Sequence, residues 1–228
     1  EALTNANEAY DAARRLGDEN SPDVIAAKIL VGRGYDSAGR LPESLGLFED
    51  ALGAARRIGN AELFADAVNH FTDTAVMTGE QHQKAIDLCL SALENLPAQD
   101  EIRRCGLMGQ LSRTYIFTGQ YEESSAFSQK TMELAAKLGD HKAQFSVMMA
   151  RFGAPFVARK TDKALNWREN LDSMHKVAEK LGTIDQGRNL TLRLFLGAEM
   201  ADRQLMDQTL ELLTEISNKE NHLQLYWV

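Results

Sequence analysis

The 228-residue chain contains only two cysteines and four prolines, and it has no long apolar run. Cys89 and Cys105 are too few for a disulfide framework, and with no visible signal peptide they indicate reduced thiols in a cytoplasmic protein. No stretch approaches the roughly 18 apolar residues of a membrane span. Acidic residues outnumber basic ones by 33 to 25, which argues against a dedicated surface for nucleic acids or anionic membranes.

Catalytic and metal-binding patterns are equally scarce. The glycine-rich segment 34–41 has the glycine spacing of a phosphate-binding loop but lacks the lysine and the following hydroxyl residue that grip phosphate and magnesium. None of the five histidines pairs with another at ligand spacing, so a metal site would need ligands from distant parts of the chain. Cys89 is interpreted as a small core residue. We therefore expect no cofactor, no metal and no enzymatic activity.

Glycines, in contrast, recur at a nearly constant interval. A motif of the type Arg-Arg-Leu-Gly-Asp has its glycine at Gly17, and its relatives place glycines 42, 122 and 165 residues further along the chain, at Gly59, Gly139 and Gly182. A second series lies between these marks, with neighbouring members 40 residues apart: Gly39, Gly79 and Gly119. Such a period is the signature of a stacked-repeat protein.

Each repeat is predicted to hold two helices. Over residues 42–57, Leu45, Phe48 and Leu52 follow the three-and-four spacing of one helical face, and residues 101–118 behave alike. The sequence shows no convincing alternating strand pattern. Pro155 lies inside a helical pattern over residues 145–157, and it predicts a kink or an early break.

Small, aromatic and glycine residues occupy matching places in three successive units. The first unit reads Gly32, Tyr35, Gly39, Ser44, Phe48 and Ala51. The second, with one residue inserted after its glycine, reads Ala75, Gly79, Ala85, Cys89, Ala92 and Pro97. The third reads Ser112, Tyr115, Gly119, Ser124, Ser128 and Thr131. In this pattern the chain resembles the tetratricopeptide (TPR) family.

The resemblance covers about residues 1–218 and implies an all-α fold, a right-handed α–α superhelix of antiparallel helix pairs. In the last two units, Arg159 and Arg203 stand roughly where a turn glycine is expected. We expect a single solenoid over residues 1–228, with a partial unit, five repeats and the start of a further helix: 1–18, 21–60, 61–99, 100–140, 141–182, 183–218 and 219–228.

The two ends of the chain look like cuts through repeats, so the sequence is interpreted as a segment of a larger protein. The terminal Tyr226 and Trp227 would then be open to water. We therefore expect either self-association through the terminal repeats, as in a homodimer, or packing of both side chains back onto the last complete unit. The repeated end motif also resembles the helical sensor arrays of bacterial signalling ATPases and transcription regulators.

The TPR resemblance implies that the first helix of each unit lines an inner, concave groove. Residues one and four places after the small packing residue would point into it. The candidate partner-binding residues, with adjacent inward positions, are Arg33, Asp36, Asn69, Asp73, Arg113 and Phe117. Alternating charges beside a phenylalanine suit an extended or helical peptide, and exposed charges of this kind contribute little to stability. The lysine–asparagine set that binds chaperone tails is missing, so a chaperone adaptor is not expected.

These observations favour a protein-interaction scaffold or sensor segment of a cytosolic signalling or regulatory protein. The alternative is a sensor for a small molecule or signal peptide, with an apolar pocket opened by Pro155 beside Met148, Met149, Phe152 and Phe156. An enzyme would need a convergent polar cluster that the sequence does not contain.

Overall fold

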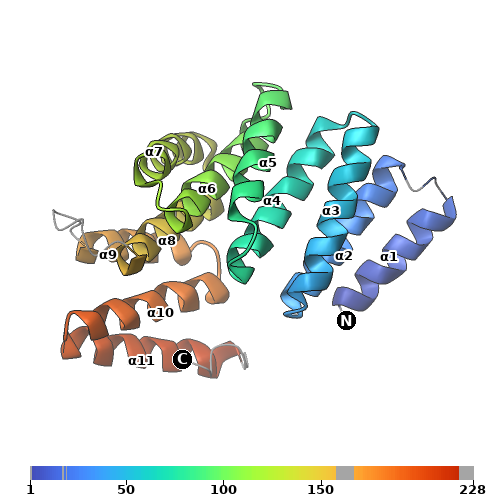
Figure 1. Cartoon of the computed structure of the whole chain (residues 1–228). Helices are drawn as coiled ribbons and strands as arrows, with labels where there is room; N and C mark the ends of the chain where they lie inside the picture. The colour runs from blue at the N-terminus through green and yellow to red at the C-terminus, as the bar shows by residue number, and fades with distance from the viewer. Residues whose placement is uncertain (1, 17, 19, 158–166, 221–228) are drawn as a thin grey trace. The chain divides into compact units, whose positions relative to one another are not determined.

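The computed structural model describes residues 2–16, 18, 20–157 and 167–220. Every regular element in these ranges is a helix, and no strand occurs among them (Figure 1). The all-α prediction is therefore confirmed. The contacts divide the chain into two compact units, residues 1–134 and 135–228, which are described separately. The expectation of one continuous solenoid stays a prediction.

The first unit is a series of antiparallel helices that lie side by side (Figure 1). Its elements are α1 (Ala2–Leu16), α2 (Pro22–Ser37), α3 (Leu41–Arg57), α4 (Ala61–Thr78), α5 (His82–Asn95), α6 (Glu101–Phe117) and most of α7 (Tyr121–Leu138). Consecutive helices from α1 to α6 pack on each other, and in addition α2 contacts α4 and α4 contacts α6. The first helices of successive repeats thus form a layer of their own.

Two adjacent residues explain the recurring end motif at the boundaries before α4 and α8 (His141–Val157). Gly59 ends α3 with a φ of 66°, in the left-handed region that glycine tolerates best. The next residue, Asn60, caps α4 by accepting a hydrogen bond from the Leu63 N–H at 2.9 Å. Asp140, after Gly139, caps α8 in the same way. The end motif, which also suggested a resemblance to sensor arrays, therefore has a structural role: its glycine ends one helix and the residue after it caps the next.

The core of the first unit depends on close approach between paired helices. A Cβ atom on Gly32 would lie 2.5 Å from the Phe48 ring, so α2 and α3 can pack this closely only with glycine at that point. Beside it, the Ser44 hydroxyl donates to the Gly32 carbonyl at 2.9 Å. In the third repeat Ser112 and Ser124 replace this pair, and each hydroxyl donates to the other residue's carbonyl.

The second unit contains the end of α7 and the helices α8 (His141–Val157), α9 (Trp167–Ala178), α10 (Thr183–Glu199) and α11 (Arg203–Glu220). It has a small core of its own, formed by Phe145, Leu171, Met174, Ala178, Leu192 and Leu196. Met148 and Met149 pack against this core. The structure therefore does not place these two methionines in the open apolar pocket expected near Pro155.

Two sequence-based expectations about breaks and turns need correction, and a third gains detail. Helix α8 includes Pro155 and runs to Val157, so the chain does not leave the helix at the proline, and a kink there stays a prediction. The left-handed turn residue between α10 and α11 is Ala201, with a φ of 53°, whereas Arg203 is already the first residue of α11. The residue inserted after Gly79 adds a second left-handed position, at Gln81, whose φ is 60°. Arg159, Tyr226 and Trp227 lie outside the described residues.

Candidate functional site

The candidate partner-binding residues lie on the three first helices of the first unit. Arg33 and Asp36 are on α2, Asn69 and Asp73 are on α4, and Arg113 and Phe117 are on α6. Arg33, Asp73 and Arg113 occupy equivalent positions, 40 residues apart. Because α2 contacts α4 and α4 contacts α6, the repeat brings these positions onto neighbouring helices. We call this surface the α2–α4–α6 face.

Hydrogen bonds between neighbouring repeats occupy several of these side chains. Thr74 Oγ1 donates to Asp36 Oδ1 at 2.9 Å, which joins α4 to α2. Arg113 Nη2 lies 2.5 Å from Asp73 Oδ1, which joins α6 to α4. Gln110 donates to the backbone carbonyl of Asn69 at 3.2 Å, a further link between α6 and α4 that does not use the Asn69 side chain. Much of the polar set therefore holds the first helices together.

This pairing changes the expectation that all the charges are exposed. The Arg113 side chain is only 21% exposed, and it also donates to Gln110 at 2.7 Å. Its Nε is buried without a hydrogen-bond partner. Reversing the charge at Arg113 would therefore disturb packing and pairing, whereas Arg33 is exposed and makes no ion pair with any residue that the structure describes. Of the two arginines, Arg33 is the more exposed.

Two exposed apolar side chains lie one helical turn beyond the Asp73–Arg113 pair. Met77 on α4 is 61% exposed and Phe117 on α6 is 47% exposed, and they are again 40 residues apart. The His82 ring stacks on Phe117 with centroids 5.5 Å apart. We call Met77, His82 and Phe117 the apolar platform. Sequence reasoning missed Met77 and His82, although the 40-residue equivalence with Phe117 would have identified Met77.

A second charged cluster ties α4 to α6 near the other end of these helices. Arg103 donates to both carboxylate oxygens of Asp66, at 2.7 and 3.0 Å, and to Asp100 at 2.9 Å. The hydrogen bonds that Arg103 donates to Asp66 are the main cause that raises the pKa of Arg103 above its ordinary value. A bidentate pair of this kind fixes the relative orientation of two helices, so we assign it a structural role.

The structure also places the cysteine and the glycine-rich segment that the sequence singled out. Cys89 is fully buried against Thr72, and burial raises the pKa of its thiol to about 12, which keeps it protonated and unreactive at neutral pH. The described residues contain no group of histidine, cysteine or carboxylate side chains suited to a metal ion. The glycine-rich segment 34–41 ends α2 and turns into α3, with Gly39 left-handed at a φ of 73°.

The solved structures with similar folds are helical-repeat proteins. BtubC (BKLC) from P. vanneervenii superposes with a TM-score of 0.67 at 14% identity, covering 96% of this chain and 91% of that one. A putative kinesin light chain with nearly identical TPR-like repeats, from P. anserina, gives TM-scores of 0.57 and 0.55 in two crystal structures, at 16% identity, covering 78% of this chain and 86% of that one. No family model matches the sequence, and no curated protein matches it.

The chain therefore has a TPR-like helical-repeat fold. This agrees with the resemblance found in its Gly-Tyr-Gly and Ser-Phe-Ala positions. Within the described residues, no helix has both the length and the apolar character needed to cross a lipid bilayer.

Proposed function

We propose that this TPR-like protein is a protein-interaction scaffold that binds an extended peptide along the α2–α4–α6 face. The observation that carries the proposal is the pair of exposed apolar side chains, Met77 and Phe117, on the contacting helices α4 and α6, with the exposed Arg33 on the neighbouring α2. Apolar side chains that stay open on a folded surface commonly mark a contact site. An acidic residue of the peptide would pair with Arg33, and an apolar residue would cover Met77 and Phe117.

The spacing of the helices predicts the spacing of the peptide's residues. Neighbouring packed helices are about 8–10 Å apart. The platform lies one to two such steps from Arg33, and an extended chain rises roughly 3.3 Å per residue. The acidic and apolar residues of the partner should therefore be separated by about three to six positions.

Selection from a random peptide library displayed on phage tests this proposal. Enriched peptides should carry Asp or Glu and an aromatic or aliphatic residue at that separation. Arg33→Glu and Phe117→Ala should each weaken the binding of a selected peptide, measured by calorimetry, by about tenfold or more, because a charge-assisted contact or a buried aromatic anchor typically contributes over 1.4 kcal/mol.

Matched controls separate this face from the rest of the surface. Lys180→Glu makes the same change of sign at an exposed site on the second unit, and Ile102→Ala truncates an apolar side chain that is 68% exposed near the start of α6. Both variants should bind the selected peptide as the unmodified protein does. Equal losses in test and control variants, or a selection without any common motif, would contradict the proposal.

The proposal also includes a cellular role for the scaffold. A signalling or regulatory role in the cytoplasm, without direct contact to nucleic acid, is consistent with the acidic composition and the absence of cofactor motifs. Self-association through terminal repeats stays part of the proposal and is tested by sedimentation. A sensor for small molecules is the second candidate function, and a cavity in the second unit favours it.

A further inference from the structure

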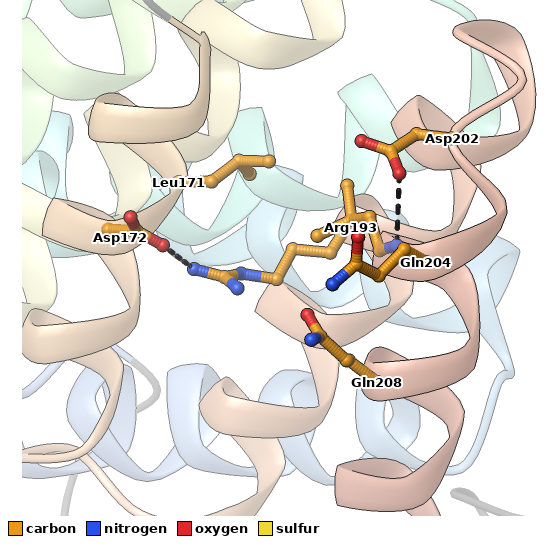
Figure 2. A pocket seen from close by; sticks show the side chains of 7 residues that line it. Leu171, Asp172, Arg193, Asp202, Gln204 and Gln208 are labelled. Carbon is orange, nitrogen blue, oxygen red and sulfur yellow. Dashed lines mark hydrogen bonds and ion pairs between the residues drawn. The ribbon is translucent and has the colours of Figure 1, made fainter.

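A cavity of about 230 Å³ lies among α9, α10 and the start of α11 in the second unit (Figure 2). Cavities of about 150 Å³ already hold a six-membered ring, so this one has room for a small organic molecule. Most of its lining is polar and comes from three helices and one turn. The lining residues are Leu171, Asp172, Arg193, Asp202, Gln204, Leu205 and Gln208.

Arg193 is the central cation of this cavity. Its side chain reaches from α10 toward α9, where it is paired with Asp172 (Figure 2). Only 13% of the arginine side chain is exposed, and its Nε is buried without a hydrogen-bond partner. A guanidinium has five N–H donors, so one carboxylate contact leaves most of its hydrogen-bonding capacity unused. Burying such a group costs free energy unless a further acceptor is supplied.

Carboxylates and amides complete the lining. The Asp172 side chain is 64% exposed. Asp202 caps α11 by accepting from the Leu205 N–H at 3.1 Å. Gln204 and Gln208 lie one helical turn apart on α11, on the same side as the cavity, and each amide can both donate and accept (Figure 2). The cavity therefore offers one cation, two anions and two neutral amides.

This mixture of charges points to the ligand class. A simple anion would be attracted by Arg193 but repelled by the two carboxylates. A simple cation would be attracted by the carboxylates but repelled by Arg193. A ligand with both charges can pair each with its opposite. We propose that the cavity binds a small zwitterion of the free amino acid type, with its carboxylate toward Arg193 and its ammonium group toward the acidic side chains. The site is in the other unit from the α2–α4–α6 face and does not depend on peptide binding there.

Titration of the isotopically labelled whole chain, followed by amide chemical shifts, tests the proposal with matched probes. L-alanine and L-glutamine are the zwitterions. Propionate is alanine without its amino group, and ethylamine is alanine without its carboxylate. We expect saturable shifts in α9, α10 and the start of α11 with at least one zwitterion, at no less than tenfold lower concentration than with propionate or ethylamine.

Variants assign the binding to the cavity. Arg193→Gln should weaken zwitterion binding at least tenfold, whereas Arg188→Gln, which removes a 64% exposed arginine from the same helix, should leave it unchanged. Gln208→Ala should weaken zwitterion binding severalfold. Because the Gln208 side chain is exposed, this variant should fold, and it tests binding in the cavity even if Arg193→Gln fails to fold. The proposal is overturned if none of the four probes causes saturable shifts, if propionate binds as tightly as alanine, or if the Arg193 and Gln208 variants both bind like the unmodified protein.

Discussion

Ala201 ends α10 in a backbone conformation that other turns of this chain give to glycine. Its φ of 53° is left-handed, and the Asp202 N–H donates to the Gly197 carbonyl at 2.8 Å. The same six-residue closure follows α6, where Gly119 has a φ of 76° and the Gln120 N–H donates to the Tyr115 carbonyl. Alanine is strained in this region because its Cβ crowds the backbone. The turn geometry is thus kept even where the favoured residue is missing.

Replacing Ala201 with glycine should therefore stabilise the protein by roughly 1 kcal/mol, since the relief of strain exceeds the entropy lost by glycine. Gly119→Ala should lower the free energy of unfolding by a similar amount, because no neighbouring atom crowds its Cβ and backbone strain alone remains. Urea denaturation measures both changes. A destabilising Ala201→Gly would show that the left-handed turn is not strained.

The pairing of Asp73 with Arg113 could not be predicted from the sequence, although the positions of both residues could. The repeat spacing predicted that Asp73 and Arg113 would occupy equivalent places on neighbouring helices, and the structure puts them there. Periodicity could not indicate that they bind each other, because pairing depends on the distance between helices and on rotamers. Arg33, at the same repeat position, remains exposed.

At the scale of helices, the separation between α2 and α3 is set by a missing side chain. Gly32 faces the Phe48 ring, and Phe48 is 1% exposed in the core. Glycine normally weakens a helix interior by about 1 kcal/mol relative to alanine, so its presence here reflects packing. Gly46 on α3 is also inside a helix but has no neighbouring atom within 4 Å of an added Cβ.

These two glycines should respond to alanine in opposite directions. Gly32→Ala should destabilise the protein by about 1–3 kcal/mol, because a Cβ 2.5 Å from the ring forces the helices apart. Gly46→Ala should stabilise it by roughly 0.5–1 kcal/mol through helix propensity. Thermal unfolding followed by circular dichroism distinguishes them. If both variants shift the unfolding midpoint in the same direction, the close approach of α2 and α3 does not determine which residue is tolerated at position 32.

Helix positions were predictable because their ends carry local signals. Glycine followed by asparagine or aspartate both stops one helix and caps the next, so Gly59–Asn60 and Gly139–Asp140 marked real boundaries. Pro155 did not mark a boundary in this way, because the chain is still helical at the proline and α8 runs to Val157. Proline removes one helical hydrogen bond, and whether the helix ends there also depends on packing, which periodicity does not determine.

At the scale of the whole chain, two compact units contain separate buried clusters. One is centred on residues such as Phe71 and Leu111, and the other on Leu171 and Met174. In stacked repeats each unit is stabilised mainly by its neighbours, so stability need not be uniform along the chain. The sequence showed the repeat but not this division, because the repeats after residue 140 keep little of the motif.

Core truncations should therefore act mostly within their own unit. Phe71→Ala and Leu171→Ala each remove a side chain that is at most 1% exposed, and each should cost its unit about 2–5 kcal/mol. Amide hydrogen exchange should show the largest loss of protection in residues 1–134 for the first variant and in residues 135–228 for the second. A uniform loss across the chain in both variants would mean that the units unfold together.

The turn between α4 and α5 has a consequence for engineering. Two residues separate Gly79 from α5, whereas one residue separates Gly39 from α3 and Gly119 from α7, yet α4 and α5 pack on each other as α2 and α3 do. The extra length is absorbed by the left-handed Gln81, next to the exposed Glu80. Exposed turns that already tolerate a length change are good sites for grafting. A short epitope tag or a fluorescent reporter inserted after Glu80 would leave the chain's repeating register intact on both sides.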